Sequence, residues 1–126
     1  MSNALVVTIV LMGCARIAID LSPFLAARQV SQLIGFPAAH DSPTARLMAR
    51  LFGVRDIGLG VLAFYAVLHP ATAGFVLIFN ACMDAGDLFS AGLPLARREG
   101  IDRGAARSGA MALTGGVMWI VVWLAL

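Results

Sequence analysis

Charged and amide side chains interrupt the apolar stretches of the sequence, and their types and spacing suit acid–base chemistry. Arg55 and Asp56 are adjacent in the stretch LFGVRDIGLG, residues 51–60. Asn80, Asp84 and Asp87 are four and then three residues apart, so in a helix they lie on one face. Two carboxyl groups with separated pKa values, bridged by an arginine, can act as a general acid and a general base. These residues are therefore candidates for a catalytic site.

The composition indicates that the helices carrying these residues lie in a membrane. Of the 126 residues, 60% are hydrophobic and 13% are charged, whereas a soluble domain is about 45–50% apolar and about 25% charged. Four apolar segments, about 3–20, 45–68, 71–93 and 104–126, each approach the ~20 residues that cross a bilayer. We expect a single all-α domain over residues 1–126, an integral membrane four-helix bundle. The first segment lacks a basic start and is expected to be a retained span.

The chain between the first two spans predicts a short extra helix. Ser22 stands where an N-cap is expected, and Pro23 stands at the first helical position. Apolar and polar residues then take opposite sides of a helix over SPFLAARQVSQLIGF. We expect a short amphipathic helix at the membrane interface, either as a linker or as a lid over a polar cavity. Ser42 and Pro43 predict the start of span two.

The arginines predict the orientation of the chain. They cluster between spans one and two and between spans three and four, whereas the HPAT link and both termini have none. Positive charge marks cytoplasmic loops, so both termini are expected outside, in what we interpret as a bacterial inner membrane. Trp119 and Trp123 are then expected at the outer interface.

The charged and amide residues of the first three spans are predicted to reach overlapping depths. Counted at 1.5 Å per residue, they lie ~6–20 Å from the cytoplasmic ends, with Asp20 at the edge. Four such charges facing lipid would cost ~10 kcal/mol, so we expect them to be paired, hydrated or neutral. Three arginines against four aspartates leave one carboxyl group in excess, which is expected to keep its proton. The set comprises Arg16, Asp20, Arg50, Arg55, Asp56, Asn80, Asp84 and Asp87.

Helical periodicity predicts which side chains share a face. Gly53, Asp56 and Gly60 fall on one side of span two, where the glycines let a neighbouring backbone approach. Arg55 points ~100° away from Asp56, so the two are expected to serve different neighbours. On span four, Met111, Thr114 and Met118 are interpreted as ordinary packing residues, with an apolar wall of the site as the alternative.

The stretch ARLFGVRDIGLGVL, residues 49–62, resembles a G-x-R-D-x-x-L-G stretch of a family of small four-span membrane proteins from bacteria and fungi. The arrangement also resembles small membrane enzymes of polyketide pathways that open epoxides by hydrolysis or cyclisation. The resemblance implies an epoxide-opening activity on a small lipophilic substrate. No cofactor is expected, and no metal site is expected because the aspartates lack supporting His or Cys residues.

Opening an epoxide requires an acid that protonates the ring oxygen and a base that activates water or an internal hydroxyl. We expect Asp56 and Asp84 to be this acid–base pair, in an order that the sequence leaves open, with Arg55 or Arg16 as the bridge. Asp87 is expected to tune the pair. Substrate binding is expected from Asn80, Arg50 and Asp20.

Other functions stay open on the sequence alone. A proton-coupled transporter, an accessory subunit and a purely structural ion-pair network are all compatible with intramembrane carboxylates. A magnesium–diphosphate site at NACMDAGD is disfavoured because only one such motif is present. The net charge of +2 does not suggest nucleic acid, so the expected partners are the bilayer and the substrate. The glycines of span four, at positions 104, 109, 115 and 116, suit close packing either within the bundle or between the subunits of a homodimer.

Overall fold

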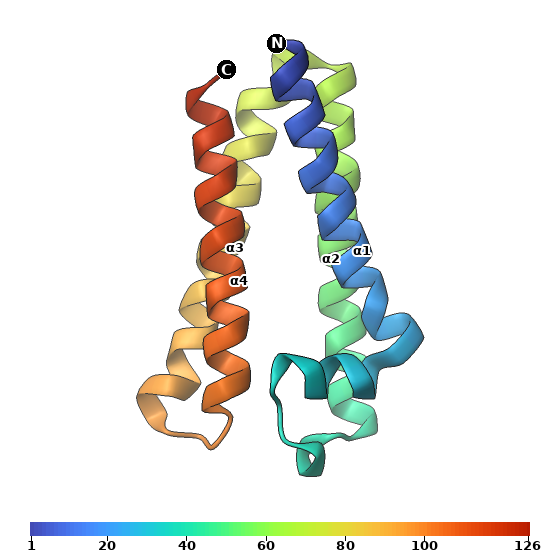
Figure 1. Cartoon of the computed structure of the whole chain (residues 1–126), viewed down its shortest axis with the longest axis vertical. Helices are drawn as coiled ribbons and strands as arrows, with labels where there is room; N and C mark the ends of the chain where they lie inside the picture. Colours follow the sequence, from blue (N-terminus) through green and yellow to red (C-terminus); the bar gives the residue numbers. More distant parts are fainter.

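The computed structural model describes residues 1–126, which are folded almost entirely into helices (Figure 1). Four long helices are each long and apolar enough to cross a membrane, and two one-turn helices lie in the links. The predicted all-α four-helix membrane bundle is therefore confirmed. The elements are α1 (Asn3–Ile34), η1 (Ala38–His40), α2 (Pro43–Leu68), η2 (Pro70–Thr72), α3 (Ala73–Arg97) and α4 (Asp102–Leu124).

The bundle is built from two hairpins. α1 packs mainly along α2, and α3 packs mainly along α4, while the two pairs contact each other less. Figure 1 shows the pairs meeting at the end that carries both termini, here called the narrow end, and diverging toward the opposite, wide end. The HPAT link thus joins helices of different hairpins, α2 and α3, at the narrow end.

An apolar core joins all four helices toward the narrow end. Ile9, Leu77 and Trp119 are among its most buried members, and Ala63 of α2 completes the contact. The expectation that Trp119 lies at the outer interface is wrong, because its side chain is only 2% exposed. The indole fills the space between the hairpins, whereas Trp123, one turn later, is 40% exposed.

Glycines bring α2 against α1. A Cβ atom at Gly53 would lie 2.5 Å from the carbonyl oxygen of Asp20, and one at Gly60 would lie 2.9 Å from that of Gly13. Both distances are shorter than carbon and oxygen tolerate, so only glycine permits these approaches. The predicted role of the glycines is confirmed, and the backbone that approaches them belongs to α1.

The helix of span one continues beyond its predicted end. Pro23 has no N–H to donate to the carbonyl of Ile19, and the Ser22 hydroxyl donates to this carbonyl instead. The prediction that Ser22 is an N-cap is therefore wrong. The helix breaks at Ala26, whose φ of −150° and ψ of 50° are not helical. The predicted short helix follows this break rather than Ser22.

Residues 27–36, here called the crossing segment, run across the wide end toward α4 (Figure 1). Nη1 of Arg107 donates to the carbonyl oxygen of Leu33 over 2.8 Å. The ring of Phe36 occupies the space where Gly104 lacks a side chain, because a Cβ there would lie 2.6 Å from it. The crossing segment therefore bridges the two hairpins at the wide end.

The link after the crossing segment is anchored to the start of α2. Ser42 is the N-cap, as predicted, and its hydroxyl accepts from the N–H of Ala45 over 3.1 Å. Asp41 accepts from two nitrogens of Arg46, and this hydrogen bonding lowers the pKa of Asp41 below its usual value.

Substitution of Gly53 by alanine tests the close approach of α1 and α2. We expect Gly53→Ala to lower the free energy of unfolding by about 1–3 kcal/mol, because the methyl group overlaps the Asp20 carbonyl. Gly58→Ala is the matched control on the same helix, since no atom lies within 4 Å of the added carbon. Denaturant unfolding in detergent measures both. Equal stability of the two variants would contradict the predicted contact.

Candidate active site

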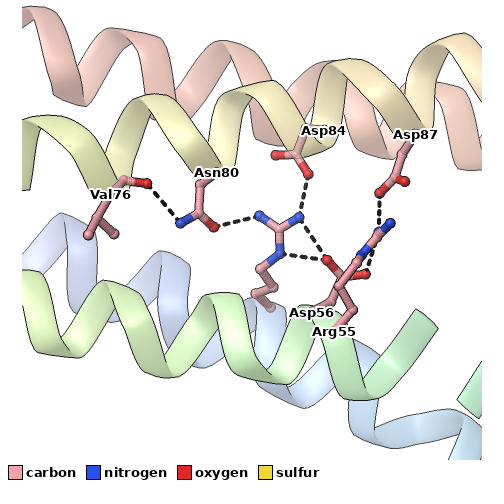
Figure 2. Close-up of polar contacts among 7 residues, drawn as sticks. Arg55, Asp56, Val76, Asn80, Asp84 and Asp87 are labelled. Carbon is pink, nitrogen blue, oxygen red and sulfur yellow. Dashed lines mark hydrogen bonds and ion pairs between the residues drawn. The ribbon is translucent and has the colours of Figure 1, made fainter. Parts of the chain in front are cut away.

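Side chains from three helices meet between the two hairpins. α1 contributes Arg16, α2 contributes Arg55 and Asp56, and α3 contributes Asn80, Asp84 and Asp87. Figure 2 shows Asp84 and Asp87 on one helix turned toward Arg55 and Asp56 on another. These six residues are called the polar network below. They share a level in the bundle, as their predicted depths require.

Arg16 lies at the centre of the polar network. Its Nε and Nη2 donate to Oδ1 of Asp56 over 3.3 and 3.1 Å. Nη2 also donates to Oδ1 of Asp84 over 2.5 Å, and Nη1 donates to Oδ1 of Asn80 over 2.9 Å. The side chains of Arg16, Asp56 and Asp84 are only 11%, 9% and 7% exposed. Arg16 is thus the bridge between the two predicted acid–base residues.

Asn80 holds the bridging arginine in place. It is fully buried, and its Nδ2 donates to the carbonyl oxygen of Val76 over 3.0 Å (Figure 2). Because this bond orients the amide, its oxygen faces Arg16. The structure therefore places Asn80 as a positioning residue for the guanidinium, whereas the sequence suggested contact with the substrate.

Arg55 joins the network at its outer edge. Its Nη2 donates to Oδ2 of Asp56 over 2.9 Å and to Oδ2 of Asp87 over 2.6 Å. The guanidinium also lies 5.4 Å from the ring centre of Phe52, within range of a cation–π contact. The expectation that Arg55 and Asp56 serve different neighbours is wrong, because the long arginine side chain bends back to the adjacent carboxylate.

The two remaining predicted residues lie apart from these contacts. Asp20 lines the same cavity as the network but forms no ion pair. Arg50 is exposed, does not line the cavity, and reaches only the carbonyl oxygen of Pro23, over 3.5 Å. Five residues separate Arg50 from Arg55, which turns them ~140° apart on α2. Arg50 therefore shares the predicted depth but not the face.

A cavity of about 950 Å³ lies beside the polar network. Both arginines of the network and four aspartates line it, from α1, α2 and α3. Three residues of α4 also line it: Met111, Thr114 and Met118. They therefore form part of a cavity wall, which was the alternative to an ordinary packing role. Phe36 of the crossing segment also lines the cavity, toward the wide end. The walls combine charged side chains with apolar ones, as sites for small molecules do.

Asp84 has one oxygen without a partner. Oδ1 accepts from Arg16, whereas Oδ2 is buried and forms no hydrogen bond. A Cβ atom at Gly115 would lie 2.9 Å from Oδ2, so the bare backbone of α4 faces this oxygen. The glycines of span four, Gly115 among them, predict close packing, but contact of Gly115 with Asp84 depends on how α3 and α4 meet, which no local pattern encodes. A buried carboxylate oxygen with no donor is costly unless it carries a proton.

The network has more carboxyl groups than guanidinium groups. Two arginines face Asp56, Asp84 and Asp87, and Asp20 adds a fourth carboxyl group to the cavity. The carboxylates are arranged around the arginines and not around one another, so no three of them converge as metal ligands do. The arrangement can hold one carboxyl group neutral beside an ionised one.

Comparison with known protein families assigns the chain to one family. The profile of the DUF4267 family, described as a domain of unknown function, matches residues 13–126. The chain belongs to this family. The match includes every residue of the polar network. No curated protein and no solved structure matches the chain. Because the family description gives no activity, the chemistry is inferred from the geometry of the site.

Substitution of Arg16 tests the central bridge. We expect Arg16→Met to lower the free energy of unfolding by about 3–5 kcal/mol at neutral pH, because it leaves buried carboxylates without their shared cation. The loss is expected to shrink in acid, where those carboxylates become neutral. Denaturant unfolding in detergent at several pH values measures it.

Arg50→Met is the matched control for this variant. It removes the same charge from an exposed position and is expected to cost less than about 1 kcal/mol. Similar losses in the two variants at neutral pH would contradict the bridging role of Arg16.

Proposed function

We propose that the protein is a membrane-embedded acid–base enzyme that opens an epoxide in a small lipophilic substrate. The observation that carries the proposal is the unpartnered Oδ2 of Asp84, buried beside a cavity and joined through Arg16 to a second carboxyl group. The earlier resemblance to membrane epoxide-opening enzymes supports the same chemistry. The alternatives, a proton-coupled transporter or an accessory subunit, have no comparable atom-level observation in their favour.

Asp84 is the proposed general acid. Because carboxyl groups outnumber arginines here, one of them binds a proton, and the free Oδ2 is the oxygen that can carry it. Its other oxygen accepts from Arg16, so the neutral carboxyl group is held with its hydroxyl free to donate. A neutral acid of this kind matches the acceptor character of an epoxide oxygen.

Asp56 is the proposed general base. It accepts hydrogen bonds from both arginines, and it is the proposed proton acceptor while Asp84 is the proposed donor. Its Oδ1 already accepts two hydrogen bonds from Arg16, whereas Oδ2 accepts one, from Arg55. A second lone pair of Oδ2 can therefore accept from a water molecule or a substrate hydroxyl. Asp87 shares Arg55 with Asp56 and thereby tunes how strongly that arginine holds the base.

The reaction then proceeds by paired proton transfers. Asp84 donates its proton to the ring oxygen as one carbon–oxygen bond of the epoxide breaks. An oxygen of water or of a substrate hydroxyl forms the new bond to that carbon, and its proton moves to Asp56. A proton then returns from Asp56 to Asp84 through water in the cavity, which restores the starting state.

The membrane context of the proposal follows from the arginines. Seven of the nine lie at the wide end, in the first link, near the start of α2 or around the α3–α4 turn. Positive charge is retained on the cytoplasmic side, so the proposed orientation has both termini outside, in a bacterial inner membrane. The polar network is then reached from the cytoplasmic half, where water is available for hydrolysis.

Substitution of Asp84 tests the activity. We expect Asp84→Asn to lower kcat by ~10²–10⁴-fold on a lipophilic epoxide, because the amide still accepts from Arg16 but carries no acidic proton. Asp102→Asn makes the same change at an exposed position outside the network and is expected to leave kcat unchanged. Turnover of an epoxide panel in heavy-oxygen water measures both and separates a labelled diol from an unlabelled cyclic ether.

A wild-type protein that converts no epoxide of the panel would contradict the proposal. Full activity of folded Asp84→Asn would contradict the assignment of the acid. Unfolding measurements on the same samples distinguish a loss of chemistry from a loss of structure.

A further inference from the structure

A second hollow meets the polar network at Asp84. It is a groove of about 390 Å³ between α3 and α4, here called the α3–α4 groove. No residue of α1 or α2 lines it, and Leu113, Val117 and Val121 on its wall are each more than half exposed. In a bilayer this groove faces hydrocarbon. Asp84 is the only charged residue that lines it, and it also lines the cavity between the hairpins.

Asp84 lies near the middle of the groove. The α3 wall extends from Ile78 to Leu88, which corresponds to ~15 Å of helix, and Asp84 lies ~9 Å from one end and ~6 Å from the other. Across from it, a Cβ at Gly116 would lie 3.3 Å from the Cβ of Asp84. On the α4 side, the residues that lie against Asp84 are Gly115 and Gly116, so backbone and no side chain lies between its free Oδ2 and the groove.

The contents of the groove follow from the physics of the bilayer. An apolar chain gains little by leaving lipid for an apolar groove, because lipid tails are equally apolar. Selectivity must then come from the one polar group present. The buried Oδ2 of Asp84 has no partner, so a ligand that supplies a hydrogen-bond acceptor at this level satisfies it.

We propose that the α3–α4 groove binds the hydrocarbon chain of the substrate from the bilayer, with the epoxide ring at mid-chain beside Asp84, where the groove meets the cavity that Asp56 lines. The inference rests on the proposed function and specifies its substrate class as a linear aliphatic epoxide with apolar arms on both sides of the ring. The side of Oδ2 that faces α4 meets Gly115, which has no side chain.

Cys82 provides a binding measurement that does not depend on turnover. It is an exposed free thiol on the groove wall, and Cys14, the other cysteine, is removed by Cys14→Ser. The probe is a straight-chain epoxide with the ring at mid-chain. Its isomer with the ring at the chain end and the alkane of equal length are the comparison ligands. The rate at which a membrane-permeant maleimide modifies Cys82 is measured with each.

We expect the mid-chain epoxide to slow modification of Cys82 about tenfold at ~10 times its Kd. The chain-end isomer and the alkane are expected to protect much less. Absence of protection, or equal protection by the alkane, would overturn the groove inference even where turnover is observed. Protection without turnover would support the groove and count against the proposed catalytic function, so the two failures are distinguishable.

A filled groove gives an independent test. Ala85 is exposed, lines only this groove and has no contact in the polar network, so Ala85→Leu is expected to abolish protection and lower kcat/KM for the mid-chain epoxide about tenfold or more. Ala106→Leu is the matched control at an exposed α4 position outside both hollows. Unchanged protection in Ala85→Leu would overturn the inference.

Discussion

The guanidinium of Arg16 is the interaction on which the rest of the arrangement depends. It belongs to the α1–α2 hairpin but bonds to Asn80 and Asp84 of the other hairpin as well as to Asp56 of its own. The helices contact one another less between the hairpins than within each hairpin. In hydrocarbon a charge without partners is costly, so this shared cation both permits the carboxyl groups and ties the hairpins together.

The polar network contains more carboxyl groups than guanidinium groups, which distinguishes it from an ion-pair network with a purely structural role. A network that served only to hold helices would be expected to match its charges and satisfy its polar atoms. Here Oδ2 of Asp84 has no donor, and three carboxyl groups share two arginines. The glycine backbone of α4 beside this oxygen keeps the space free of side chains. The excess carboxyl group is therefore retained at a cost that apolar packing would avoid, which favours a chemical role.

Helical periodicity and hydropathy predict most of the fold, because both are local properties of the chain. The shared face of Asn80, Asp84 and Asp87 follows from their spacing alone. The depth of a residue in the membrane does not say toward which side of its helix the side chain points. Depth alone therefore groups Arg50 with the polar network, although its side chain points away from it, toward Pro23. Ser22 was misassigned because a serine before proline can cap a helix or replace the N–H that proline lacks. The contact of Gly115 with Asp84 depends on how α3 and α4 meet, which no local pattern encodes.

The division into two hairpins also bears on how the chain enters the bilayer. The deep charges of the first hairpin are Arg16, Asp20, Arg55 and Asp56, two of each sign. Since synthesis begins at the N-terminus, this half is complete first and carries no net deep charge. The second hairpin brings Asp84 and Asp87 without a deep arginine of its own. The α3–α4 hairpin is therefore stable in lipid only when the α1–α2 hairpin is already there to supply the arginines. The order of translation thus matches the order in which the charges can be neutralised.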